Sequence, residues 1–224
     1  MGMVSIFTGI SIILASYLIG SVPYGWLVVK IFSGKDVRQI ESGRTGGTNA
    51  MRAAGIGAGI LTAILDILKG AASVWLAKAV TDNVWLHILA PLAVILGNNY
   101  SIFLAERDAN GRLRLRGGAG GAACVGGSLG LWAPSVLIIL PLGALVFFGI
   151  GYASVTTMSA ALIATVIFAV RAQLGLSPWQ YILYGILAEL LLLWALRPNI
   201  RRLKEGTERL HGWRAKRREK QTKE

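Results

Sequence analysis

The chain contains 224 residues, of which 54% are hydrophobic and 15% are charged, and its mean hydropathy is +0.58. A soluble domain carries about 25% charged residues and could not cover this much apolar surface, whereas a disordered chain requires low hydrophobicity. The composition excludes both classes and predicts an integral membrane protein.

The net charge of +12 and the single cysteine narrow the function classes further. In a membrane protein, an excess of Lys and Arg is typical of cytoplasmic loops, and no basic run interleaved with aromatic residues indicates a nucleic-acid surface. Cys124 can form no intrachain disulfide, and His87 and His211 lack a paired-ligand spacing. We therefore expect no nucleic acid, metal, cofactor or obligate protein partner, and we interpret these three side chains as packing or surface residues.

Seven apolar segments approach the roughly 20 residues that a transmembrane helix requires. In chain order they cover residues 4–29, 54–77, 84–104, 118–132, 135–150, 154–170 and 179–196. The turn at 132–134 is the least distinct boundary, and six spans are the alternative if segment 118–132 re-enters the membrane instead of crossing it. The sequence thus predicts an all-α integral membrane protein with about seven transmembrane helices.

Basic residues are divided very unevenly between the two ends of these segments. Residues 30–52 contain five Lys and Arg, residues 107–116 contain four, and the chain from Arg197 onward contains eleven. Only Lys78 and Arg171 lie near boundaries on the opposite side. Seven spans place the three basic stretches on one side, which the positive-inside rule assigns to the cytoplasm. We expect an external N-terminus, a cytoplasmic C-terminus and a multi-pass protein of the inner cell membrane.

Four polar patches at the expected cytoplasmic side could carry chemistry, because polar sequence at membrane depth is costly. The first, GSVPYG at 20–25, contains Pro23, which should kink the helix for packing or to shape a site. The second is the loop 41–52, ESGRTGGTNAMR, whose hydroxyls, amides, glycine N–H groups and arginines suit an oxyanion such as phosphate better than an ordinary polar loop requires. In the next span, Asp66 and Lys69 share a helix face and are expected to neutralise each other.

The third patch combines LGNNYSIF at 96–103 with the glycine cluster GGAGGA at 117–122. Glycines at a helix start offer N–H groups to phosphate, although close helix packing would use them equally well. Between these segments, Asn-Gly at 110–111 beside alternating Arg and Leu predicts a small β-hairpin near 107–116. The fourth patch combines YAS at 152–154 with RPNIRRLKEGTE at 197–208, where Ser154 could be only a helix N-cap and the arginines only lipid contacts.

The order of these motifs resembles the bacterial family of acyl-phosphate-dependent glycerol-3-phosphate acyltransferases, which are seven-span membrane enzymes with a cytoplasmic site. Its most specific motif, S-G-N-x-G-[AG]-T-N-x-x-R, is similar to SGRTGGTNAMR at 42–52, and N-[IV]-x-R-L-x-x-G-T-E matches 199–208 closely. Weaker matches to G-S-[IV]-P-[FY], G-H-x-[FY]-x-x-F, G-G-K-G and Y-x-S lie at 20–24, 97–103, 117–120 and 152–154. The resemblance implies a single membrane acyltransferase-like domain at 1–208, followed by a basic cytoplasmic tail at 209–224.

The same resemblance implies the reaction and its residues. The enzyme would transfer a fatty acyl group from acyl phosphate to the 1-hydroxyl of glycerol 3-phosphate, giving lysophosphatidic acid in the first step of phospholipid synthesis. Membrane lipids would surround it. The residues that match the family's catalytic positions are Ser42, Arg52, Ser154 and Asn199. Those expected to bind the substrates and their phosphates are Gly43, Arg44, Thr48, Asn49, Arg116, Gly117, Gly118, Gly120 and Arg202.

Several positions depart from the family pattern. They are Asn98 in place of His, Ala119 in place of the Lys of G-G-K-G, Ala123 in place of Thr, Leu196 in place of the His of H-x-x-N, and Arg44 in place of Asn. Arg44 or Arg116 could supply the charge that is lost at position 119. The alternatives are a paralogue with a changed acceptor or donor, and a catalytically inactive membrane protein that binds lipids or a partner.

Overall fold

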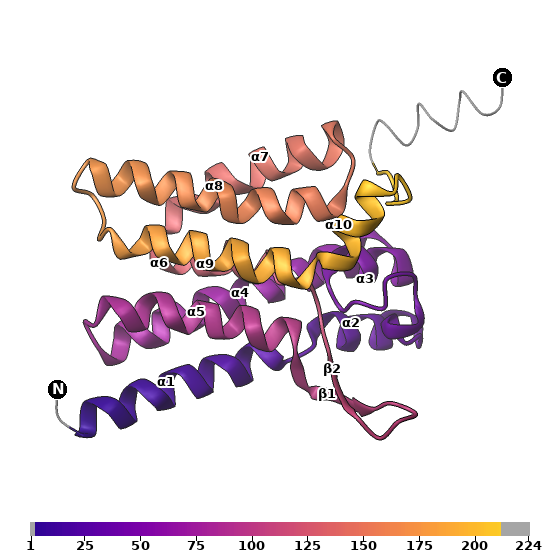
Figure 1. Cartoon of the computed structure of the whole chain (residues 1–224), viewed down its shortest axis with the longest axis horizontal. Coiled ribbons are helices and arrows are strands. Elements are labelled where there is room, and N and C mark those ends of the chain that lie inside the picture. Colours follow the sequence, from indigo (N-terminus) through magenta and orange to yellow (C-terminus); the bar gives the residue numbers. More distant parts are fainter. Residues whose placement is uncertain (1–2, 212–224) are drawn as a thin grey trace.

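Ten α-helices and one β-hairpin are present in residues 3–211, the part of the chain that the computed structural model describes. The helices are α1 (Met3–Ser21), α2 (Tyr24–Ser33), α3 (Gly47–Ala54), α4 (Ile56–Val80), α5 (Val84–Asn99), α6 (Gly121–Leu131), α7 (Val136–Gly149), α8 (Ala153–Gln173), α9 (Gln180–Ala195) and α10 (Arg197–Lys204). Helices α7 and α8 form one edge of the bundle, α4, α6 and α9 the middle, and α5 with α1 the opposite edge (Figure 1).

Each of the seven predicted apolar segments contains a helix, but the lengths of these helices differ. Three segments, Ser5–Ser33, Ile56–Val80 and Ala153–Gln173, are long and apolar enough to cross a membrane, and α9 with α10 forms a fourth if this pair, bent by 67°, is one span. Helices α5, α6 and α7 are apolar but shorter; the 11 residues of α6 extend only about 16 Å at 1.5 Å per residue. Seven crossings, and the side on which each terminus lies, remain predictions.

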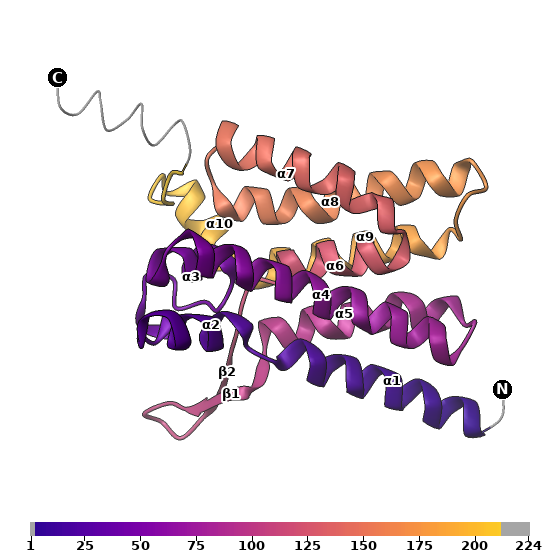
Figure 2. The ribbon, with the colours of Figure 1, turned by 180° about the vertical axis from the view of Figure 1, so that it is seen from behind.

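The three basic stretches meet at one end of the bundle. The segment containing α2 and α3, the β-hairpin and α10 all lie at the end opposite the N-terminus, as both views of the ribbon show (Figures 1 and 2). Most of the predicted tail, residues 212–224, lies outside the described residues. This arrangement is the one that the uneven charge distribution requires, whichever side of the membrane that end occupies.

Two predicted boundaries were wrong. The third apolar segment was expected to remain helical to residue 104, but α5 ends at Asn99 and a strand begins at Ser101, whose hydroxyl donates to Ser21 O at 2.5 Å. The loop expected at 41–52 is helical from Gly47, because Ala50 and Ala53 pack into a small core with Val29 and Val37. Pro23, which was expected to kink the first helix, lies at the interruption that separates α1 from α2.

The predicted hairpin is confirmed. Strands β1 (Ser101–Arg107) and β2 (Leu113–Arg116) pair antiparallel, and Asp108 Oδ1 accepts from the backbone N–H groups of Asn110 and Arg112 in the turn, both at 2.9 Å. Arg38 anchors the hairpin to the segment after α2 by pairing with Asp36 and with Glu106. The Arg38 guanidinium lowers the pKa of Asp36 to about 2, so this anchor persists at neutral pH.

Close contact between α4 and α6 holds the middle of the bundle together. A Cβ at Gly126 would lie 1.9 Å from the carbonyl oxygen of Ile67 and 3.0 Å from the Cα of Gly70. Small residues therefore let the two backbones meet, as is usual where helices pack in membranes. On the other face of α6, Tyr184 donates from its hydroxyl to Cys124 O at 2.7 Å, which ties α9 to the same core.

Gly126→Ala should lower the temperature of unfolding in detergent, because the added methyl group forces α4 and α6 apart, at a cost of about 1–3 kcal/mol. Gly57→Ala is the matched control, since a Cβ at this helical position has no atom within 4 Å. It should leave stability equal or slightly higher, because alanine favours helix. Equal melting temperatures for the two variants would contradict the assigned packing.

Candidate functional site

A pocket of about 580 Å³ opens at the end of the bundle where the basic stretches meet. It is lined by the loop 41–46 and by residues from α3, α4, α6, α7, α8 and α10. Three of the four polar patches identified in the sequence contribute to it. The first patch does not line it, but Val22 O accepts a hydrogen bond from Lys69 at 3.2 Å, and the backbone at Gly25 packs closely against Thr45 O.

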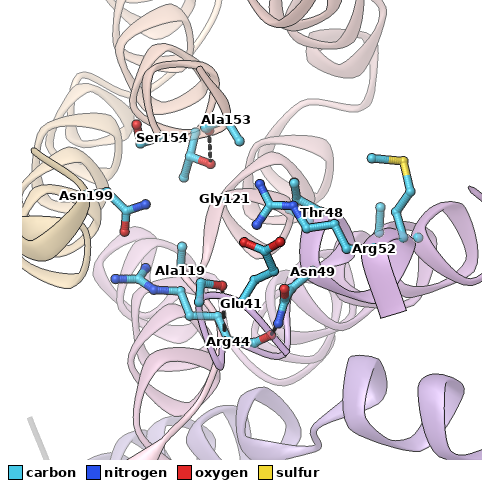
Figure 3. A pocket seen from close by; sticks show the side chains of 18 of the residues that line it. Glu41, Arg44, Thr48, Asn49, Arg52, Ala119, Gly121, Ala153, Ser154 and Asn199 are labelled. Carbon is cyan, nitrogen blue, oxygen red and sulfur yellow. Dashed lines mark hydrogen bonds between the residues drawn. The ribbon is translucent and has the colours of Figure 1, made fainter. Parts of the chain in front are cut away.

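Three helices each place their first two residues in the wall of the pocket. The first residues of α3 (Gly47, Thr48), of α6 (Gly121, Ala122) and of α8 (Ala153, Ser154) all line it, and Figure 3 shows members of all three starts around one space. The first N–H groups of a helix have no partner within the helix, and its N-terminus carries a partial positive charge. Three such ends together favour a ligand with more than one negative charge.

The left-handed conformation of Gly120 is what aims the start of α6. Its φ of +86° would strain any other residue, and its carbonyl accepts the backbone N–H of Cys124 at 2.8 Å as the first bond of the helix. The glycine cluster therefore does build a helix start beside a pocket, as the sequence predicted.

Charged side chains in the pocket are incompletely compensated. Each carboxylate that lines it has a cationic partner: Asp66 pairs with Lys69, Glu208 with Arg202 and Glu41 with Arg209. In residues 3–211, neither Arg44 nor Arg52 has a carboxylate partner within ion-pair distance. Two guanidinium groups are thus left to attract anions.

The surroundings of Arg44 and Arg52 make their positive charges energetically unfavourable. Burial lowers the pKa of Arg44, and the nearby charge of Arg202 lowers it further. Burial also lowers the pKa of Arg52, with Arg209 as the next cause. Because a guanidinium stays protonated at any physiological pH, the cost appears as an unfavourable positive potential, which a bound anion would relieve. Figure 3 shows Arg52 reaching into the pocket from α3 and Arg44 extending toward Asn199.

The structure brings most of the predicted site residues together. All four residues predicted to be catalytic line the pocket, with five of those predicted to bind substrate: Ser42, Arg52, Ser154, Asn199, Arg44, Thr48, Asn49, Gly120 and Arg202. Ser154 is the second residue of α8, not its N-cap, and its buried hydroxyl has no partner in residues 3–211. The alternative that Ser154 is only a cap is therefore wrong, and its hydroxyl is available to a ligand.

Four predicted binding residues do not line the pocket: Gly43, Arg116, Gly117 and Gly118. Arg116 is at the end of β2, where it pairs with Glu106 at 3.3 Å. The backbone at Gly117 and Gly118 is used structurally, since Gly117 O accepts from Thr45 N at 3.3 Å and Gly118 N donates to Asn98 O at 2.7 Å. These bonds join the loop before α3 to the end of α5.

Asn49 has a structural task inside the pocket wall. Its side-chain amide nitrogen donates to the carbonyl oxygens of Val37, Ile40 and Arg44 at 2.9–3.0 Å. Those three bonds occupy the side-chain donors of Asn49 and hold the segment before α3 against this helix. Arg44 in turn donates to Ala195 O at the end of α9, which fixes the side chain across the pocket.

Four of the five positions that depart from the family pattern line the pocket: Arg44, Asn98, Ala119 and Leu196. The Asn98 side chain accepts from Lys69 Nζ at 2.6 Å, and Ala119 leaves the entrance to α6 without a cation. Arg44 is in the pocket and Arg116 is not, so of the two arginines considered as replacements for the missing lysine, only Arg44 is placed for it.

Sequence reasoning missed Phe147, Glu208, Arg209 and His211. The first three line the pocket, and His211 Nε2 lies 2.7 Å from Arg52 Nη2. Glu208 orients two neighbours at once, accepting from Asn199 Nδ2 at 2.8 Å and pairing with Arg202 at 3.2 Å. Arg209 and His211 were missed because they lie in the predicted tail, and a basic C-terminal segment resembles a solvated one.

A family model described as glycerol-3-phosphate acyltransferase matches residues 10–206. The glycerol-3-phosphate acyltransferase of Rubrobacter xylanophilus is 38% identical over 204 residues, covering 91% of this chain and 96% of that protein. That of Thermus thermophilus is 36% identical over 203 residues, covering 91% of this chain and 95% of that protein.

Solved structures agree with these relatives. The crystal structure of PlsY, an integral membrane glycerol 3-phosphate acyltransferase, matches in its glycerol 3-phosphate form with a TM-score of 0.77 at 28% identity, covering 92% of this chain and 96% of that one. Its lysophosphatidic acid form matches with the same TM-score at 26% identity. With the apolar helices, this likeness identifies a membrane protein, and the resemblance seen in the motifs is confirmed: the chain belongs to the glycerol-3-phosphate acyltransferase family.

Proposed function

We propose that this protein transfers a fatty acyl group from acyl phosphate to the 1-hydroxyl of glycerol 3-phosphate, producing lysophosphatidic acid and inorganic phosphate at the cytoplasmic face of the inner membrane. The observation that carries the proposal is the pair Arg44 and Arg52, which have no carboxylate partner in residues 3–211 and share a pocket with three helix N-termini. Two phosphates held side by side are the ligands that such a site would stabilise best.

In this proposal Arg52 and Thr48 of α3, with Ser42, bind the phosphate of glycerol 3-phosphate. Arg44 and the N–H groups at the start of α6 bind the phosphate of the acyl donor. Ser154 and Asn199 position the acceptor from α8 and α10, and Arg202 acts through Glu208, which holds Asn199. Asn49 shapes the loop instead of contacting phosphate, because its donors are already engaged.

The reaction needs little from a protein base. The 1-hydroxyl oxygen attacks the acyl carbonyl carbon, the bond between that carbon and the phosphate oxygen breaks, and the departing phosphate takes the hydroxyl proton. Acyl phosphate is an activated anhydride with its own basic oxygens, so the site contributes mainly orientation and charge stabilisation. The departures from the family pattern at positions 98, 119 and 196 are compatible with this chemistry.

An apolar side of the pocket suits the acyl chain. Ile56, Ile60 and Ala63 of α4 line it together with Phe147 of α7, and both isoleucines are more than half exposed. A fatty chain could extend from the polar end along this surface into lipid, burying its methylene groups at about 0.8 kcal/mol each.

Arg44→Asn should lower kcat/KM for the acyl donor by about ten- to a hundredfold, because Asn leaves the donor phosphate without its nearest guanidinium. Adding Ala119→Lys to this variant should restore a substantial part of the lost kcat/KM, since a lysine just before α6 returns a cation to the same phosphate. A double variant no more active than Arg44→Asn alone would contradict the assignment of Arg44 as the compensating charge.

The test of the function is the purified protein in detergent with palmitoyl phosphate and glycerol 3-phosphate. Phosphate release that depends on both substrates, with lysophosphatidic acid as the lipid product, is the expected result. Phosphate release with another polyol phosphate in place of glycerol 3-phosphate would instead support the altered paralogue, and no acyl transfer to any acceptor would support an inactive binding protein.

A further inference from the structure

The segment after α10 folds back over the pocket, and we refer to residues 207–211 as the C-terminal strap. It is tied down at three places. The backbone N–H groups of Thr207 and Glu208 donate to Arg202 O at 2.9 and 3.1 Å, the N–H of His211 donates to Gly151 O at 2.7 Å, and Arg209 pairs with Glu41. The strap thereby joins α10 to the turn between α7 and α8 and to the loop before α3.

The imidazole of His211 is held between two elements of the site. Its Nε2 lies 2.7 Å from Arg52 Nη2, and its ring stacks on Phe147 with centroids 5.4 Å apart and an angle of 26° between the planes. Because a guanidinium can only donate, His211 Nε2 must accept, which assigns the imidazole as neutral with its proton on Nδ1.

The charges around His211 favour this neutral form. Burial lowers its pKa, and the positive charges of Arg52 and Arg209 lower it further, whereas Glu208 and Glu41 act in the opposite direction. The charged form is therefore disfavoured at neutral pH, and the ring accepts from Arg52 until the pH falls below this lowered pKa, which is less than the ordinary value of 6.5.

We infer that His211 is a positioning residue, which holds the guanidinium of Arg52 toward the pocket through a neutral acceptor. A carboxylate in the same place would orient Arg52 equally well but would cancel the charge that attracts phosphate. A neutral imidazole fixes one terminal nitrogen and leaves the full positive charge, together with Arg52 Nε, which has no partner in residues 3–211. The role in turnover rests on the proposed function, whereas the contact itself does not.

The kinetic test compares the full-length wild type with His211→Ala, His211→Gln and the control His87→Gln. His87 is the other histidine of the chain; its Nε2 lies 2.7 Å from Thr81 O, far from the pocket lining. At pH 7.5, His211→Ala should raise KM for glycerol 3-phosphate about tenfold and change kcat little, as for loss of a hydrogen bond to a charged group. His211→Gln should recover most of the loss through its amide oxygen.

Acid pH provides a readout that packing alone would not move. As the pH falls through the lowered pKa of His211, protonation removes the acceptor, so KM for glycerol 3-phosphate should rise more steeply for the wild type than for His211→Gln. The ratio of the two KM values is the quantity to compare, because protonation of glycerol 3-phosphate affects both proteins equally and cancels in it. The inference would be overturned if His211→Ala and His211→Gln had the same KM for glycerol 3-phosphate at pH 7.5 and at acid pH. It would also be overturned if both variants had the KM of the wild type.

A spectroscopic test remains valid even if no acyl transfer occurs. The 224-residue chain contains two histidines, so ¹⁵N-histidine labelling gives NMR signals from two imidazoles. The signals that disappear in His211→Gln belong to His211. His211 should carry its proton on Nδ1, and Arg52→Ala should raise its pKa. An inactive wild type with these signals would remove the proposed function alone, whereas a His211 signal unaffected by Arg52→Ala would remove the inference.

Discussion

Arg52→Ala should lower kcat/KM for glycerol 3-phosphate by about a hundred- to a thousandfold. Arg52 reaches into the pocket from α3 without a carboxylate partner in residues 3–211, so its charge is available to the acceptor phosphate at each stage of the reaction. Truncating one partner of a buried charged contact costs about 2–5 kcal/mol, and each 1.36 kcal/mol is a factor of ten in rate. Steady-state phosphate release with palmitoyl phosphate measures the effect.

Two further variants separate charge from geometry. Arg52→Lys keeps the charge but loses the planar fork and the contact with His211, so it should retain an intermediate activity. Arg201→Ala removes the same charge from the same end of the bundle, yet Arg201 is exposed and its ion-pair partner is Glu205 at 2.8 Å, outside the pocket lining, so it should behave as wild type. Equal losses in Arg52→Ala and Arg201→Ala would mean that net charge, and not a bound phosphate, explains the result.

The sequence predicted the elements of this site well because chemistry and helix geometry reinforce each other there. Gly120 was expected at the start of a helix, and its left-handed backbone does begin α6 beside the pocket. Arg52 and Ser154 were expected in one site although about a hundred residues separate them. Each lies at the end of an apolar segment that the charge distribution puts on the same side as the basic stretches. The hairpin followed from Asn110-Gly111, whose turn chemistry is local.

What the sequence could not predict depends on contacts between distant segments. Arg116 stands beside the glycine cluster in sequence but pairs with Glu106, which the register of β1 and β2 places opposite Arg114, two residues away along β2. Asn49 looked like a phosphate ligand, and only the folded loop shows that carbonyl oxygens use its donors. His211 looked like a surface residue, since nothing local indicates that the strap returns to Arg52.

Helix α3 illustrates how a pattern can hide an element. Gly46 and Gly47 made the stretch 41–52 resemble a loop, since glycine weakens a helix. In the structure Gly55, with φ of +88°, lies between α3 and α4, and Gly47 lets α3 approach the backbone of Gly59 in α4. Tertiary packing therefore overrides local propensity here, and the helix start that results is part of the site.

Lys69→Met should cause the largest loss of stability, about 3–5 kcal/mol, because it leaves the carboxylate of Asp66 buried without its partner. Lys69 Nζ lies 2.8 Å from Asp66 Oδ1 and donates to Asn98 Oδ1 and Val22 O, so a single cation joins α4, the end of α5 and the break after α1. Thermal unfolding in detergent should occur many degrees below the wild type.

The double variant Asp66→Asn with Lys69→Met decides what the pair is for. Removing both charges removes the unpaired carboxylate, so most of the lost stability should return. If the two groups only neutralise each other, acyl transfer should return with stability. Asp66 also lines the pocket, however. A double variant that is stable but inactive would therefore show that the pair takes part in the reaction, and a Lys69→Met protein as stable as the wild type would show that the buried carboxylate does not depend on it.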